Sequence, residues 1–273
     1  MKRKVEKAAK FDAFTLISIT IALLVMLFIG SVVCAIIIGG IPNFTMAFQS
    51  EEVRFAIKLS SMTATVSTVI CMLLAIPTSY ALTRTNMPFK RLARILLELT
   101  LSMPYLLLGF SLLIIFSSSF GKTLKEMGIK VVFSQLGIIM AQLTVNLPFC
   151  IRMVRTAFSD VEERLEYIAQ LLGASKFKAF ITITLPLCRS ALVSTFILTW
   201  SRALGEFGAT LMLVGITRMK TETLPGSIYL NISTGNNSMA MATAMIILLI
   251  SGAALIISNL LSGNKNQGRT GEA

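Results

Sequence analysis

Histidine is absent from the 273-residue chain, and its four cysteines form no CxxC pair (Cys34, Cys71, Cys150 and Cys188). Zinc sites and disulfide frameworks need closely spaced cysteines or histidines, so we expect no metal site and no disulfides. A GxxxxGK[ST] phosphate-binding loop, an HExxH motif and a Ser/His/Asp set are also missing. The chain therefore cannot bind ATP through such a loop or hydrolyse a substrate by these means, and we expect it not to be an enzyme.

Charged residues are scarce as well. They make up 14% of the chain, whereas 55% is hydrophobic and the mean hydropathy is +0.78. Soluble domains carry about 25% charged residues, so the composition indicates an integral membrane protein. A helix needs about 20 apolar residues to cross the bilayer. Six runs meet this requirement, and the alternating ten-residue strands of a barrel do not occur. The runs cover residues 14–38, 60–82, 95–117, 133–151, 190–213 and 239–262.

The first apolar run follows the basic start MKRKVEKAAK and continues for about 25 residues. The apolar core of a cleaved secretion signal is shorter, about 7 to 15 residues. We therefore expect this run to remain in the protein as a membrane span. The sequence predicts an all-α membrane protein with six transmembrane helices.

Lysine and arginine residues decide the orientation, because they accumulate in short cytoplasmic loops. With the N-terminus inside, seventeen of them fall on the cytoplasmic side, seven fall outside and Arg202 lies within a span. Both termini are therefore predicted to be cytoplasmic. The same asymmetry accounts for the net charge of +12. We favour it over nucleic-acid binding or a basic funnel for anions.

Two features within the spans suggest close packing or function. In the second span, small residues recur on one helix face, which favours helix packing over a subunit interface; they are Ser60, Ala64, Ser67, Cys71 and Ala75. In the fifth span, Arg202 and Glu206 stand four residues apart. A charge at the centre of a membrane helix costs about 2.5–3.5 kcal/mol. These two residues are therefore either a structural ion pair or a polar patch in a translocation pathway, and both interpretations remain open.

The longest predicted cytoplasmic loop, about residues 156–189, contains EYIAQLLGASKFKAFITITLP from Glu166 to Pro186. We expect a helix that begins near Asp160, with Glu163 as a capping partner, and ends at Gly173. One face of this helix is apolar (Leu165, Ile168, Ala169 and Leu172). A second short amphipathic helix would carry Phe177, Phe180, Ile181 and Thr184 on one side and stop at Leu185 and Pro186. The pair would present an apolar surface to a partner below the membrane.

This stretch resembles the coupling loop of permease subunits of ATP-binding-cassette importers, whose pattern is E-A-A-x3-G-x9-I-x-L-P. Gly173 and the run from Ile183 to Pro186 match without a gap. Tyr167 and Ile168 replace the usual Glu and Ala, Ala169 is retained, and an acid stands one place earlier, at Glu166. The resemblance implies ATPase coupling through Glu166, Tyr167, Ala169, Gly173, Ala174, Ile183, Leu185 and Pro186.

Three further segments are similar to permeases of molybdate, tungstate and sulfate importers: residues 147–158, 201–215 and 221–236. The similarity covers most of residues 55–262. It implies a type I importer permease with a cytoplasmic segment at 1–13, a transmembrane domain at 14–262 and a cytoplasmic tail at 263–273.

The implied partners are a second permease copy, two ATPase subunits that bind ATP and Mg²⁺, an extracytoplasmic oxyanion-binding protein and membrane lipid. No cofactor is expected in this chain and no nucleic acid among its partners. Molybdate or tungstate is the first expectation for the substrate, and sulfate or thiosulfate the alternative. A secondary transporter or channel that uses Arg202 and Glu206 as an ion relay is the rival from another class.

Overall fold

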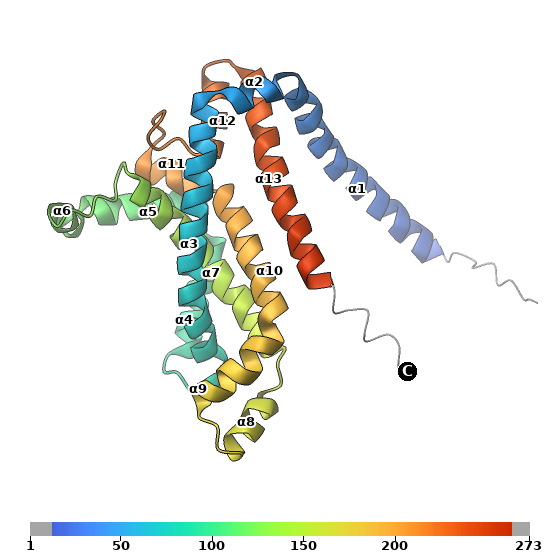
Figure 1. Ribbon diagram of the computed structural model, residues 1–273, viewed down its shortest axis with the longest axis vertical. Helices are drawn as coiled ribbons and strands as arrows, with labels where there is room; N and C mark the ends of the chain where they lie inside the picture. Colours follow the sequence, from blue (N-terminus) through green and yellow to red (C-terminus); the bar gives the residue numbers. More distant parts are fainter. Residues whose placement is uncertain (1–12, 264–273) are drawn as a thin grey trace, which may run out of the picture.

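The computed structural model describes residues 13–263, which form helices and no strands (Figure 1). The cytoplasmic segments expected at the two ends, with Lys2–Lys10, Lys265 and Arg269, lie outside the described residues apart from Ala13 and Gly263. The elements in chain order are α1 (Ala13–Gly40), η1 (Ile41–Asn43), α2 (Phe44–Gln49), α3 (Glu51–Arg84), α4 (Lys90–Ser102), α5 (Tyr105–Ser117), α6 (Ser119–Glu126), α7 (Gln135–Ser159), α8 (Glu163–Leu171), α9 (Lys176–Ala179), η2 (Phe180–Thr184), α10 (Leu185–Leu204), α11 (Gly208–Val214), α12 (Leu224–Ser233) and α13 (Asn237–Gly263).

Within residues 13–263, five helical runs are long and apolar enough to cross a membrane, and α4 with α5 forms a sixth, bent candidate. The span expected at 95–117 is therefore part of a broken helix pair that begins at Lys90. The chain turns by 111° between α4 and α5, where Met103 is extended and Pro104 precedes the new helix. Proline disfavours helical conformation in the residue before it, which accounts for the position of the break.

The expected fifth span at 190–213 is also divided. Helix α10 ends at Leu204, and α11 begins at Gly208, after a link of three residues. Arg202 therefore lies on α10, whereas Glu206 lies in the link, so the two residues do not share a helix face. The prediction assumed an unbroken helix, because every residue from 203 to 213 except Glu206 is apolar, small or a threonine.

Helices α3 and α7 pack along each other at the centre of the molecule. The stripe of small residues predicted on α3 is fully buried, from Ser60 to Ala75, so its packing role is confirmed. Gln142 of α7 is also buried. It accepts a hydrogen bond from Ser67 (3.1 Å) and donates one to the Ala203 carbonyl of α10 (2.9 Å). This side chain joins three helices where lipid would offer no partner.

The molecule has two distinct ends (Figure 1). Helices α2 and α12 lie at the upper end, and α8 and α9 lie at the lower end. Helix α1 begins and α13 ends below α2 and α12, on the side toward α8 and α9. Most side chains of α1 are exposed, because this helix packs mainly against α13.

Candidate functional site

Helix α8 ends in a left-handed turn at Gly173, where φ is +92°. Its amide donates to the Gln170 carbonyl (3.0 Å), and the next amide, of Ala174, donates to the Ala169 carbonyl (3.0 Å). These two bonds form the Schellman motif, which satisfies the last carbonyls of a helix and favours glycine at this position. The predicted helix end at Gly173 is confirmed, and Ala174 leads into the turn before α9.

The apolar face predicted on α8 lines one side of a groove of about 470 Å³. The other side comes from η2 and the first turn of α10. Three of the residues singled out from the sequence therefore meet here: Ala169, Ile183 and Pro186. The remaining lining residues are Leu165, Ile168, Leu172, Thr182 and Leu187. Leu172 is 84% exposed, so the groove is open at the lower end of the molecule.

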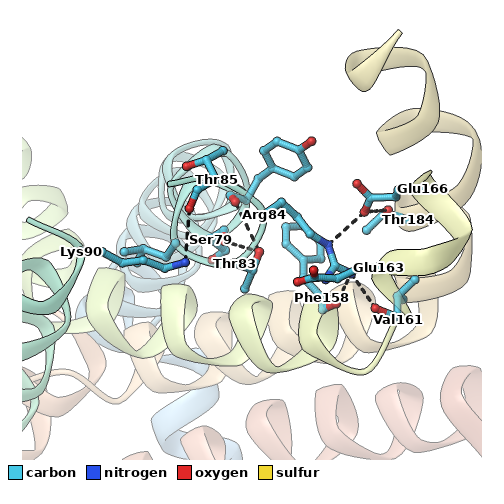
Figure 2. Close-up of polar contacts among 12 residues, drawn as sticks. Ser79, Thr83, Arg84, Thr85, Lys90, Phe158, Val161, Glu163, Glu166 and Thr184 are labelled. Carbon is cyan, nitrogen blue, oxygen red and sulfur yellow. Dashed lines mark hydrogen bonds and ion pairs between the residues drawn. The ribbon is translucent and has the colours of Figure 1, made fainter. Parts of the chain in front are cut away.

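Glu166 points away from this groove into the protein and is only 4% exposed. Its carboxylate lies 3.1 Å from Nε of Arg84, the last residue of α3, and accepts a hydrogen bond from the Thr184 hydroxyl. Figure 2 shows Arg84 between the end of α7 and α8. Its other nitrogens contact the Glu163 carboxylate (2.9 Å) and the carbonyls of Phe158 (2.8 Å) and Val161 (2.6 Å).

Arg84 therefore fixes α8 to the ends of α3 and α7, and Glu166 joins the same helix to the start of α10. A buried carboxylate needs such partners, because an unpaired charge is costly away from water. Neither contact was predicted, since Arg84 and Thr184 lie 82 and 18 residues from Glu166 in the sequence. No local spacing signals either contact.

Of the other residues named from the sequence, some pack inside the protein and others are exposed. Tyr167 is exposed, on the outer side of α8. Leu185 packs on the cluster of buried side chains around Phe158, and so does Phe180, whose ring lies edge-on to those of Tyr80 and Phe158. The face predicted for the second helix is therefore split, since Phe177 is exposed and Thr184 is buried.

Two predicted helix boundaries in this region are wrong. Helix α8 begins at Glu163 rather than near Asp160, because α7 continues to Ser159 and Asp160 caps its end. Pro186 does not stop the second helix. A π-helical turn, η2, carries the chain from α9 into α10, so the helical run extends from Lys176 to Leu204. Proline is tolerated in the first turn of a helix, which is where Pro186 stands in α10.

A second polar site surrounds Arg202. Its Nη2 donates to the Tyr105 hydroxyl (2.7 Å), its Nε faces Asn146 Oδ1 (3.4 Å), and its Cζ lies 4.5 Å from the centre of the Phe149 ring. Glu206 is buried and accepts hydrogen bonds from the Ala209 amide (2.8 Å) and from the amide and hydroxyl of Thr210.

Among the described residues, Arg202 and Glu206 form no ion pair with each other. The ion-pair interpretation is therefore wrong for this structure. Glu206 instead caps α11, because the break after Leu204 brings its carboxylate to the first amides of that helix. Both residues still line one cleft of about 240 Å³, with Tyr105, Val145, Asn146, Ser201 and Gly205. Asn146 was not singled out from the sequence, although it is a polar residue in an apolar run.

Comparison with known proteins places these features in a family. The model of the binding-protein-dependent transport system inner membrane component matches residues 75–263. The molybdenum transport system permease protein ModB of Mycobacterium bovis is 34% identical over 218 residues, 79% of this chain and 81% of that protein. The molybdate/tungstate transport system permease protein WtpB of Thermococcus kodakarensis is 36% identical over 158 residues, 58% of this chain and 60% of that protein.

A solved structure has the same fold. It is a chain of a bacterial alginate ABC transporter in complex with an alginate pentasaccharide-bound periplasmic protein. The TM-score is 0.74 at 16% sequence identity, and the match covers 95% of this chain and 96% of that chain.

Proposed function

Because this chain belongs to the family of inner membrane components of binding-protein-dependent transport systems, we propose that it is the permease subunit of an ATP-driven importer of a tetrahedral oxyanion. Molybdate or tungstate is the proposed substrate, since the relatives named above are permeases for these anions. The protein is a multi-pass protein of the cell membrane.

The observation that carries the coupling role is the groove between α8 and the start of α10. It is apolar, open at one end of the molecule, and lined by residues of the coupling-loop pattern. A helix or loop of an ATPase subunit would fill it with a few apolar anchors, as in other grooves that bind helices. Arg84 and Glu166 support this role, because they transmit a displacement of α8 directly to α3 and α10.

The proposed arrangement puts both termini and the α8–α9 unit in the cytoplasm. Residues 14–262 would form the transmembrane domain, with the coupling loop at about 156–189. Two permease copies would surround the pathway in the lipid bilayer, with two ATPase subunits below and an oxyanion-binding protein outside. The solved relative with a bound periplasmic protein supports this division of roles.

In this mechanism ATP and Mg²⁺ bind to the ATPase subunits. This chain supplies the pathway and the coupling loop through which the ATPase subunits act on it. Closure of the ATPase pair on ATP would draw the two coupling loops together and open the pathway outward to the loaded binding protein. Hydrolysis would restore the inward-open state. Nothing in this scheme involves nucleic acid.

Ala169→Glu tests the proposal, because it adds a charge to the half-buried wall of the groove. Thr156→Glu is the matched control, since it adds the same charge to an exposed site on α7, outside the groove. We expect both variants to reach the membrane. Ala169→Glu should lose the co-purifying ATPase or the ATP hydrolysis stimulated by molybdate-loaded binding protein, and the control should keep both.

Full ATPase association and uptake in Ala169→Glu would show that the groove is not the coupling surface. If sulfate-loaded rather than molybdate-loaded binding protein stimulated ATP hydrolysis, the substrate would be sulfate or thiosulfate. Uptake that follows an ion gradient and needs no ATPase would instead support a secondary transporter.

A further inference from the structure

Arg202 is exposed although it lies in the last turn of α10, within an apolar helical run long enough to span a membrane. It follows Arg189, near the cytoplasmic end of that helix, by thirteen residues, which is about 20 Å along the helix axis. An arginine that faced lipid would be costly, up to about 2.5–3.5 kcal/mol at the centre of a membrane helix. This side of α10 must therefore face water or protein in the assembled transporter.

The contacts of Arg202 hold its guanidinium in place without neutralising it. Tyr105, Asn146 and Phe149 are all uncharged, and across residues 13–263 no carboxylate forms an ion pair with Arg202. Glu206 lines the same cleft, but its oxygens are engaged by the amides and hydroxyl at the start of α11. The cleft therefore contains a fixed cation whose direct partners are neutral.

The donors in the cleft suit an anion. The Tyr105 oxygen accepts from Arg202, so its own O–H hydrogen stays available, and Arg202 Nη1 makes no hydrogen bond within the described part of the chain. The Ser201 hydroxyl also lines the cleft. The volume, about 240 Å³, holds several waters or one hydrated small ion.

We propose that this cleft is a transient contact site for a tetrahedral dianion on its way through the membrane. The inference rests on the proposed function, because it gives the transported oxyanion a specific place on this chain. The buried carboxylate of Glu206 in the same cleft weakens the attraction. A site on a transport path must be weak enough to release its ion.

Protection from an arginine-selective reagent tests the site directly. The purified transporter is treated with phenylglyoxal in molybdate or in chloride of equal ionic strength, and mass spectrometry follows the adduct on each arginine. At molybdate about ten times its Kd, occupancy should slow modification of Arg202 about tenfold. The exposed cytoplasmic Arg152 should react at the same rate in both salts.

Tyr105→Phe removes one proposed donor and should weaken protection by about tenfold in Kd. Tyr229→Phe is its matched control, because Tyr229 lies on α12 against Phe207, outside the cleft. In uptake assays Arg202→Gln should lower molybdate transport more than Arg202→Lys, which keeps the charge.

The inference would be overturned if phenylglyoxal modified Arg202 at the same rate in molybdate and in chloride. Undiminished protection by molybdate in Tyr105→Phe would also overturn it. So would loss of the second permease copy in Arg202→Gln, since Arg202 would then serve the interface. The labelling needs neither ATP nor the binding protein, so a failure of the site can be distinguished from a failure of the proposed function. Import of molybdate without protection of Arg202 would refute only the site, and protection by sulfate alone would keep the site but change the substrate.

Discussion

Arg84→Gln should destabilise the protein far more than removal of either of its acidic partners. Arg84 and Glu166 have side chains that are each 6% exposed. Removing one member of a buried pair costs about 3–5 kcal/mol when the other is left without a countercharge. After Arg84→Gln, the Glu166 carboxylate would keep only the Thr184 hydroxyl as a partner.

Glu166→Gln should cost less, about 1–2 kcal/mol, because Arg84 would still contact Glu163 and the carbonyls of Phe158 and Val161. Glu163→Gln should cost less than about 1 kcal/mol, since the Glu163 side chain is 72% exposed and solvent screens it. The order of the three effects follows from which charge is left unpaired.

Titration of the purified permease with a denaturing detergent measures the free energy of unfolding for each variant. In the double variant Arg84→Gln with Glu166→Gln, the loss should be at least about 1 kcal/mol smaller than the sum of the single losses. Additive losses would mean that the two side chains act independently. A loss for Glu163→Gln as large as that for Arg84→Gln would also refute the reasoning.

Three further changes have expected outcomes. Gly173→Ala should lower stability by about 1 kcal/mol in the same titration, because φ is +92° there and no atom within 4 Å of the added Cβ adds strain; no loss would contradict the left-handed turn. Gly109→Ala should cost about 1–3 kcal/mol, because the added Cβ would lie 2.5 Å from a backbone carbonyl oxygen of α11; an unchanged midpoint would argue against this close approach. With the exposed native cysteine of α1 replaced by serine, an impermeant thiol reagent applied from outside should label Lys122→Cys and Asn236→Cys but not Ser175→Cys. The opposite pattern would reverse the orientation.

Hydropathy predicted the spans because every helix that crosses the bilayer needs about 20 apolar residues. It could not predict the break between α10 and α11, since this break depends on neighbouring residues. The link at Glu206 forms where its carboxylate meets the first amides of α11. The ion-pair interpretation of Arg202 and Glu206, one of the two left open, assumed an unbroken helix and is wrong for that reason.

The local geometry of the candidate coupling surface could be read largely from sequence. Helical spacing correctly grouped the apolar residues of α8, and glycine correctly marked its end. The anchor of this surface could not be predicted, because Arg84 reaches Glu166 from a helix 82 residues away. Glu166, the acid that departs from the usual pattern of the family, is the buried one of the two acids that this arginine binds.

The π-helical turn from Phe180 to Thr184 lets one extra residue enter the helical run between α9 and α10. Its Leu185 amide bonds to the carbonyl of Phe180, five residues back, so the turn holds one more residue than an α-helical turn. One residue corresponds to about 100° of rotation in an α-helix. The wide turn takes up this extra residue, so α9 keeps nearly the rotation relative to α10 that an α-helix one residue shorter would give it. If the same residues were wound as an α-helix without a deletion, α9 would be rotated by about 100° relative to α10. The direction in which the α8–α9 segment faces a partner therefore depends on this one wide turn.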